Sequence, residues 1–423
     1  MIYVTVHTPL VIARSYATKT ICSDHTVVNR GFTCILKLKN KGNRDYHIQK
    51  EATTMTSIIY VGMDVHTTNY TLCSYIYGED NVFAQVQVGP DCRNILKYLQ
   101  QVREIYSDCY IKCGYEAGSL GYSLYHQLAS HDVDCTILAP TSMPETRRKG
   151  IKNDKRDARK IATCLANNTY SPVYVPTKED EAVKEYIRMR DDQKDTVKKL
   201  KQRILSLCAR HGKFFGEGSN WTQKHQAWLK KLEFGNAVLN ETLQEYLILY
   251  YQASEKVGIY DKRIEELAKH EAYAEKVKKL TCFIGIKTHT ALALIVETGD
   301  FVRFAKAQNY SSYLGLVPGE ESSGSSIQRT GITKAGNSHL RRLLVESAHS
   351  YNRGTPGVKS KTIAARQAGN EPKVIAYADR ANERLRRKFH RLMYKKTKYN
   401  VAITAVAREM SCFIWGMMTD NIA

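Results

Sequence analysis

The sequence lacks the cysteine and histidine spacing of a zinc-binding module. Its eleven cysteines are scattered over 423 residues, and Cys109 and Cys113 are the only two that lie close together. There is no CxxC motif and no histidine pair to complete a zinc site, so structural zinc is not expected. An odd number of scattered cysteines instead favours reduced thiols in a cytoplasmic protein.

Long apolar runs are also missing, and none approaches the roughly 18 residues that a membrane-spanning helix needs. We therefore expect no membrane partner. Residues 1–54 are poor in acids and show no clear periodicity. Their apolar patch at residues 9–13 is too short for the core of a signal peptide. We expect this segment to be a disordered leader before a natural start at Met55, or else a small additional arm that binds RNA or DNA.

Negative charge is scarce relative to positive charge. The 63 lysines and arginines outnumber the 42 acids, and the net charge is +21. This imbalance favours a polyanionic partner, because each neutralised phosphate releases a counterion. A solvated basic surface without a dedicated partner is the alternative. The length of the chain predicts two or three domains.

The elements expected from residue 55 onward follow one topology. Three strands are followed by helices that alternate with two more strands, which is the element order of an α/β domain with an RNase H-like fold. Strands are predicted at 57–64, 70–77, 81–88, 110–115 and 133–138, and helices at 92–106, 119–130 and 154–165. We assign residues 55–176 to this domain.

The rest of the chain is predicted to be mainly helical. Long polar helices at 177–212 and 240–279, the second in one piece or broken near Gly258, make residues 177–279 a connector. Their thin apolar stripes fit a coiled coil or dimerising arm, or equally a packed helical domain. Residues 280–423 form the C-terminal domain, which has a Gly/Ser-rich loop at 320–326 and a basic helix from Asn337 onward.

Four acids fall at positions that would bring them together. Asp64 ends the first predicted strand and Glu116 ends the fourth, so both lie at one edge of the sheet. Asp154 and Asp157 are three residues apart, on one face of a helix. Carboxylates suit Mg²⁺ or Mn²⁺, and two such ions about 4 Å apart can assist phosphodiester chemistry. Each acid taken alone would be read as a helix cap or part of a solvated, salt-bridged face.

Eight short blocks together resemble the DEDD insertion-sequence transposases, relatives of the Piv invertase. The similarity runs from about residue 55 to about residue 420. It departs from the family at residues 283–285, where a Pro-Gly step is common, and at Thr67, where lysine is common. The blocks are GMDVH at 62–66, YEAG at 115–118, KNDKRDARKIA at 152–162, ALALIVETGD at 291–300, YLGLVP at 313–318, SSG at 322–324, GITKAGN at 331–337 and LRRLLVE at 340–346.

The resemblance implies a RuvC-like catalytic domain, a helical connector and a C-terminal transposase domain. It implies that Asp64, Glu116, Asp154 and Asp157 bind metal and that Ser323, rather than Ser322, is a nucleophile. It also implies a structured non-coding guide RNA beside donor and target DNA, and a homo-oligomeric dimer or tetramer. Without the resemblance, the serines of 322–326 indicate a loop that binds phosphate through its backbone. A RuvC-like endonuclease of the Holliday-junction resolvase type is the alternative function.

Basic residues close to these blocks are candidates for contacts to nucleic-acid phosphates. A further basic stretch at 380–398, interleaved with Phe389, Tyr394 and Tyr399, is either a phosphate-binding surface or a solvated helix face. The candidates are Arg147, Arg148, Lys149, Lys152, Lys155, Arg156, Arg329, Lys334, Arg341 and Arg342.

Overall fold

The computed structural model describes residues 26–29, 32–35, 57–144, 154–323, 326–355 and 357–422. The chain divides into two compact units, Met1–Val173 and Tyr174–Ala423. Within the predicted leader, β1 (Thr26–Asn29) and β2 (Phe32–Ile35) pair as an antiparallel hairpin. The nine cysteines from Cys73 to Cys412 are free thiols.

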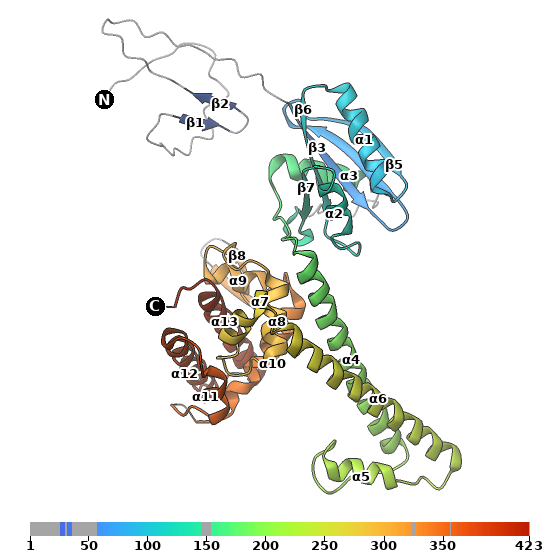
Figure 1. The fold of residues 1–423 in the computed structure, drawn as a ribbon, viewed down its shortest axis with the longest axis vertical. Coiled ribbons are helices and arrows are strands. Elements are labelled where there is room, and N and C mark those ends of the chain that lie inside the picture. The colour runs from blue at the N-terminus through green and yellow to red at the C-terminus, as the bar shows by residue number, and fades with distance from the viewer. Residues whose placement is uncertain are drawn as a thin grey trace, which may run out of the picture. The chain divides into compact units, whose positions relative to one another are not determined.

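A five-stranded mixed sheet forms the centre of the first unit (Figure 1). The central strand β3 pairs antiparallel with β4 and parallel with β6, and β7 extends the parallel side. The order is β5-β4-β3-β6-β7, so the meander lies on one side of β3 and the crossover strands on the other. This mixed α/β architecture confirms the predicted α/β class of this domain and is consistent with an RNase H-like fold. The strands are β3 (Ser57–Val65), β4 (Tyr70–Ile76), β5 (Asn81–Val88), β6 (Cys109–Glu116) and β7 (Cys135–Leu138).

Three helices pack around this sheet: α1 (Cys92–Ile105), α2 (Ser123–Ala129) and α3 (Asp154–Asn167). Helix α3 packs on β3, β4 and β6. Helix α2 begins at Ser123, four residues later than predicted. Gly121 has a φ of 59°, which a regular right-handed helix does not allow. The short 3-10 helices η1 (Tyr77–Glu79) and η2 (Pro140–Ser142) complete the regular elements.

The second unit begins with two long helices, α4 (Lys178–Arg210) and α6 (Ala237–Leu267), which pack along each other (Figure 1). The short α5 (Gln223–Lys231) lies between them in sequence. Both alternatives predicted for 240–279, one continuous helix or a break near Gly258, are wrong, because α6 runs through that glycine and ends at Leu267. The chain breaks instead at residues 268–270, where the His270 side chain accepts a hydrogen bond from the backbone of Ala272 and caps α7 (Glu271–Leu280).

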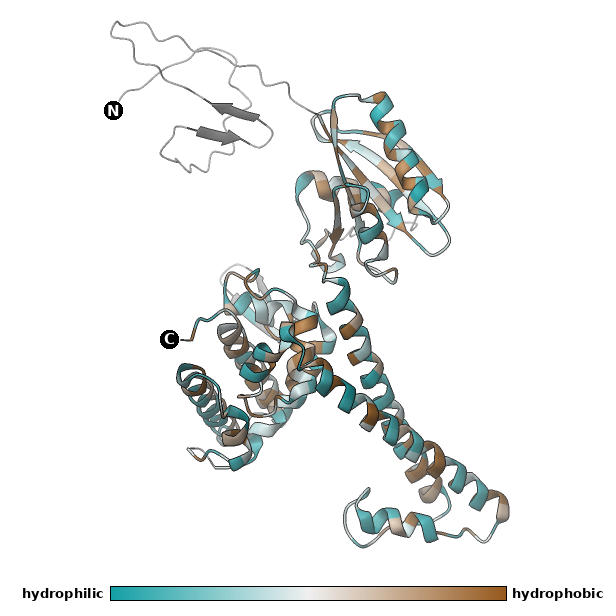
Figure 2. Cartoon of the chain, in the orientation of Figure 1, coloured by the Kyte–Doolittle hydropathy of each residue, from teal (hydrophilic) through white to brown (hydrophobic). Residues whose placement is uncertain are grey.

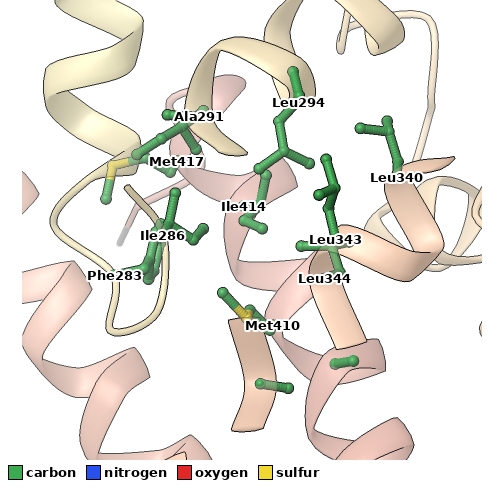
Figure 3. Close-up of a cluster of buried hydrophobic side chains, with 14 of the residues drawn as sticks. Phe283, Ile286, Ala291, Leu294, Leu340, Leu343, Leu344, Met410, Ile414 and Met417 are labelled. Carbon is green, nitrogen blue, oxygen red and sulfur yellow. The ribbon is translucent and has the colours of Figure 1, made fainter. Parts of the chain in front are cut away.

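The remaining helices enclose an apolar core. Figure 3 shows Leu294, Leu343 and Ile414 converging there from three different helices. Helix α13 is long and apolar enough to cross a membrane, but half of its apolar window is buried in the protein. We interpret α13 as a core helix, because it packs against α9, α10 and α12. The helices are α8 (Thr288–Thr298), α9 (Ala307–Tyr313), α10 (Ser338–Ala348), η3 (His349–Asn352), α11 (Lys361–Gln367), α12 (Pro372–Tyr394) and α13 (Tyr399–Met418).

The predicted Gly/Ser-rich loop at 320–326 is largely a hairpin. Strands β8 (Pro318–Ser323) and β9 (Ser326–Ile332) pair antiparallel, and Ser323 stands opposite Ser326 at the end of the ladder. The loop was predicted from the glycine and serines at the turn, which occupy only the tip of the hairpin. This prediction overlooked the β-favouring residues Ile327, Thr330 and Ile332, which continue the pairing.

A buried network of ionic groups ties α4 to α8 and α10 in the second unit. Asp191 accepts hydrogen bonds from Arg190 (2.9 Å), His339 (2.8 Å) and Arg342 (2.8 Å). Glu297 accepts a bidentate pair from Arg188 at 2.7 and 2.9 Å. The two ring nitrogens of His339 face Glu297 and Asp191 at 2.9 and 2.8 Å, so both nitrogens donate and the ring is an imidazolium. We call these residues the α4–α8–α10 network.

Candidate active site

Asp64 lies at the end of the central strand β3. Its side chain is 15% exposed, and the preceding Met63 is fully buried. The parallel register pairs Met63 with Tyr115 of β6, so Glu116 stands at the level of Asp64 on the next strand. The predicted meeting of these two acids at one sheet edge therefore agrees with the register.

A glycine in β3 allows α3 to approach this edge closely. A Cβ built on Gly62 would lie 2.1 Å from the carbonyl oxygen of Ala158 and 2.4 Å from the backbone nitrogen of Ala162. Gly62 also pairs with Gly114 of β6, so two adjacent strands lack side chains at this level. The helix consequently rests on bare backbone, and its first turn, with Asp154 and Asp157, comes close to Asp64.

Asp64, His66 and Asp154 form the tightest group of possible metal ligands among the described residues. One ligand atom from each lies within 4.8 Å of the others. Burial raises the pKa of Asp64; the nearby His66 opposes this increase, while the charges of Asp157 and Asp154 add to it. A divalent cation would relieve this crowding of carboxylates, and the oxygen donors of Asp64 and Asp154 fit Mg²⁺ or Mn²⁺.

His66 is a member of this group that the sequence did not suggest. Its Nε2 lies 3.3 Å from Oδ1 of Asp64, and its side chain is half exposed. It follows Asp64 by two residues, directly after the end of β3, and residues two apart along a strand point to the same face. That spacing was the signal available in the sequence. Glu116, in contrast, is exposed and lies outside this group.

The candidate phosphate-binding residues divide into several kinds. Arg147, Arg148, Lys149 and Lys152 lie outside the described residues. Lys155 and Arg156 are exposed in the first turn of α3, beside the acids. Lys334 is exposed and has a φ of 57°. Arg329 pairs with Glu320 in the β8–β9 ladder through its backbone.

Arg341 and Arg342 make contacts within the protein. One guanidinium nitrogen of Arg341 donates to the carbonyl oxygens of Leu314 and Ala335, at 2.9 and 2.8 Å. Arg342 donates to Asp191 of the α4–α8–α10 network. Both side chains thus hold the fold together, which the sequence alone did not reveal, and any contact to phosphate would use their remaining N–H groups.

Comparison with known proteins identifies the family to which this chain belongs. The model of the transposase IS116/IS110/IS902 family matches residues 277–362, and that of the DEDD transposases of the IS110 type matches residues 61–211. The transposase for insertion sequence element IS1533 of Leptospira borgpetersenii is 32% identical over 348 residues, which are 80% of this chain and 98% of that protein. This chain belongs to the IS110 family of transposases. The putative transposase y4qE of Sinorhizobium fredii (strain NBRC 101917 / NGR234) is 30% identical over 364 residues, 85% of this chain and 88% of the relative.

The transposase is thus of the DEDD insertion-sequence type, an enzyme that cleaves and rejoins DNA, and DNA is its partner. The matched stretch 61–211 includes Asp64, Glu116, Asp154 and Asp157. The stretch 277–362 includes Ser323.

Replacing Gly62 by alanine is expected to disable the transposase without touching a carboxylate. The added methyl group meets backbone atoms of α3, so the helix must move and carry Asp154 away from Asp64. We expect the free energy of unfolding of the first unit to fall by about 1–3 kcal/mol. We also expect cleavage to be at least roughly tenfold slower, because about 1.4 kcal/mol of lost transition-state stabilisation corresponds to a factor of ten in rate. Gly78→Ala is the matched control, because its Cβ would meet nothing within 4 Å. Equal cleavage rates and melting temperatures for the two variants would contradict this account of the packing.

Proposed function

We propose that this transposase cleaves DNA strands with a divalent cation, Mg²⁺ or Mn²⁺, held by Asp64, Asp154 and Asp157, with Glu116 at the rim, and that Ser323 is the nucleophile. The observation that supports the metal site is the convergence of Asp64, His66 and Asp154 at the end of β3. When bound there, such a cation stabilises the negative charge that develops on the oxygens of the phosphodiester. His66 contacts Asp64 and thereby orients its carboxylate.

The assignment of Ser323 is supported by the SSG block and by the position of this residue at the end of β8. In the proposed step, the serine Oγ forms a bond to phosphorus while the bond between phosphorus and one deoxyribose oxygen breaks. That oxygen leaves as a hydroxyl and carries away the proton. Attack by a hydroxyl of the other strand reverses the exchange, so the phosphodiester is rejoined without an external energy source.

Replacing Ser323 by alanine is expected to abolish the covalent protein–DNA adduct and to lower strand exchange by roughly 10³-fold or more, as loss of a covalent nucleophile does. The assay would combine the full chain, Mg²⁺, junction DNA of the element and RNA transcribed from its flanks, and score adducts on a denaturing gel. Ser322→Ala is the matched control and should retain the adduct. If Ser323→Ala cleaves at the wild-type rate and no adduct forms with either protein, the resolvase-type alternative holds.

Two partners complete the proposal. The excess of positive charge supports a structured non-coding RNA beside DNA, which would leave sequence reading to base pairing. Omitting the RNA from the assay above distinguishes a guided reaction from an unguided one.

A homo-oligomer, a dimer or tetramer, is supported by exposed apolar residues on α6: Val238, Ile248, Leu249 and Ile259.

A further inference from the structure

The stretch from Arg384 to Arg408 contains no acidic residue, although it is rich in lysine and arginine. The structure divides its basic residues into two groups. In the first group the charges are satisfied internally: Arg384 and Lys388 both pair with Glu409, and Arg386 donates to the carbonyl oxygens of Thr355 and Val358. This half of α12 carries little free charge.

The second group surrounds the turn between α12 and α13. Four basic side chains there are exposed or nearly so and make no ion pair with any described residue. Figure 2 shows α12 as a largely hydrophilic helix, in contrast to the apolar α13. We call the group, together with one aromatic residue, the α12–α13 patch: Arg391, Tyr394, Lys395, Lys396 and Lys398.

Tyr394 is unusual in its exposure. It is 90% exposed, whereas Phe389, five residues earlier on the same helix, is buried in the core. The hydroxyl group of Tyr399, on the other side of the turn, shares a hydrogen bond with Nδ1 of His349 (3.0 Å) and accepts one from the side-chain amide of Asn352 (2.9 Å). The ring of Tyr394 therefore stands free among cations, as a platform on which a base could stack.

Lys396 occupies a backbone position that favours glycine. Its φ is 56°, and the backbone N–H groups of Lys396 and Thr397 donate to the carbonyl oxygens of Met393 and Leu392. This is the hydrogen-bond pattern of a helix end closed by a left-handed residue, where glycine costs least. A cation here also faces the negative end of the α12 dipole, which offers a purely structural explanation that the test must separate.

We propose that the α12–α13 patch binds a single-stranded segment of nucleic acid, with Arg391 and the three lysines on consecutive phosphates and a base stacked on Tyr394. The free aromatic ring favours unpaired bases over a duplex, because the bases of a duplex are already stacked. The absence of acids and the density of cations favour a phosphate backbone over a protein surface. This inference deepens the proposed function by naming a surface for its nucleic-acid partners. It concerns binding alone, so it can fail while the carboxylate and serine assignments stand.

The test is fluorescence anisotropy with the full chain in EDTA, which prevents cleavage. The probes are a labelled oligothymidylate and its duplex with oligoadenylate. Tyr394→Ala should weaken binding of the single strand about tenfold and leave the duplex nearly unchanged, while Tyr394→Phe should bind as the wild type does. The triple variant Lys395→Gln, Lys396→Gln, Lys398→Gln should reduce the slope of log affinity against log salt by about 2, since each phosphate contact on a single strand contributes about 0.7.

Three further tests can refute the proposal. Lys194→Gln, Lys198→Gln, Lys199→Gln removes the same charge from exposed positions of α4, and an equal loss of affinity would overturn the assignment to this patch. Lys396→Gly relaxes the backbone while removing one cation, so we expect an unchanged or higher melting temperature together with weaker binding. Unchanged binding with a raised melting temperature would show that the lysine serves only the helix end. Polyglutamate can also be added as a competitor for the labelled single strand. If it displaces the strand equally well from the wild type and from Tyr394→Ala, the patch binds an acidic protein and base stacking on Tyr394 is wrong.

Discussion

Asp64→Asn is expected to reduce strand cleavage by about a thousandfold. Asparagine keeps the size of the side chain but removes one of the charges that would hold the cation, and a bound metal contributes several kcal/mol to stabilising the transition state. About 1.4 kcal/mol corresponds to each factor of ten, so a loss of about 4 kcal/mol gives a thousandfold effect. Because Asp64 lies against His66, Asp154 and Asp157, a remaining ligand set of lower charge should bind the cation more weakly.

The measurement has two parts, so that loss of metal binding and loss of folding are separated. Mn²⁺ binding is followed by its electron paramagnetic resonance signal, and cleavage is followed on labelled junction DNA. Asp108→Asn, an exposed acid before β6 in the same unit, should match the wild type in both assays. Wild-type Mn²⁺ affinity in Asp64→Asn would remove the acid cluster from the mechanism, whatever happened to cleavage.

Much of the catalytic sheet was predictable because its signals are local. Alternating apolar residues, turn residues and short spacings give each strand of the five-stranded sheet to within a few residues, whereas the β1–β2 hairpin was not predicted. Since β3 and β6 are parallel neighbours, Asp64 and Glu116 reach the same level without further information. The close approach of α3 was not predictable in the same way, because it depends on the pairing of Gly62 with Gly114 across two strands.

The misses share a physical cause. The roles of Arg341 and Arg342 depend on partners far away in sequence, such as Leu314 and Asp191. A basic residue on a helix looks solvent-exposed until its acceptor is known. The same holds for the highly charged sequence of α4, which is typical of a polar helix throughout but places Asp191 in the interior. Sequence periodicity reports apolar faces, and it does not report buried ionic groups.

The α4–α8–α10 network makes the stability of the second unit depend on pH in both directions. Burial by itself would raise the pKa of Glu297, but hydrogen bonds from His339 and Arg188 lower it to about 2. Its contribution is therefore complete above about pH 4.5 and is lost as pH falls towards 2. Burial by itself would lower the pKa of His339, but Asp191 and Glu297 raise it above its usual 6.5. That contribution is complete below pH 6.5 and is lost as pH rises through the raised value.

Asp191→Ala is expected to lower the free energy of unfolding of the second unit by about 3–5 kcal/mol, the range for breaking a buried ion pair from one side. The substitution leaves His339, Arg190 and Arg342 without their shared acceptor, while the side chain of Asp191 is only 5% exposed in the intact network. All three tryptophans, Trp221, Trp228 and Trp415, belong to this unit, so their fluorescence during urea unfolding reports it alone.

Asp192→Ala is the matched control for this substitution, because the neighbouring side chain is exposed and should change stability by less than about 0.5 kcal/mol. The pH dependence gives a second criterion that simple loss of packing would not meet. Without Asp191, only Glu297 remains to raise the pKa of His339, so this pKa is lower than in the wild type. The loss of stability on the alkaline side should therefore begin at a lower pH than in the wild type. If the two variants unfold at the same urea concentration, the network is dispensable, and α4 must be held to α8 and α10 by the apolar contacts around Ile187 and Ile264.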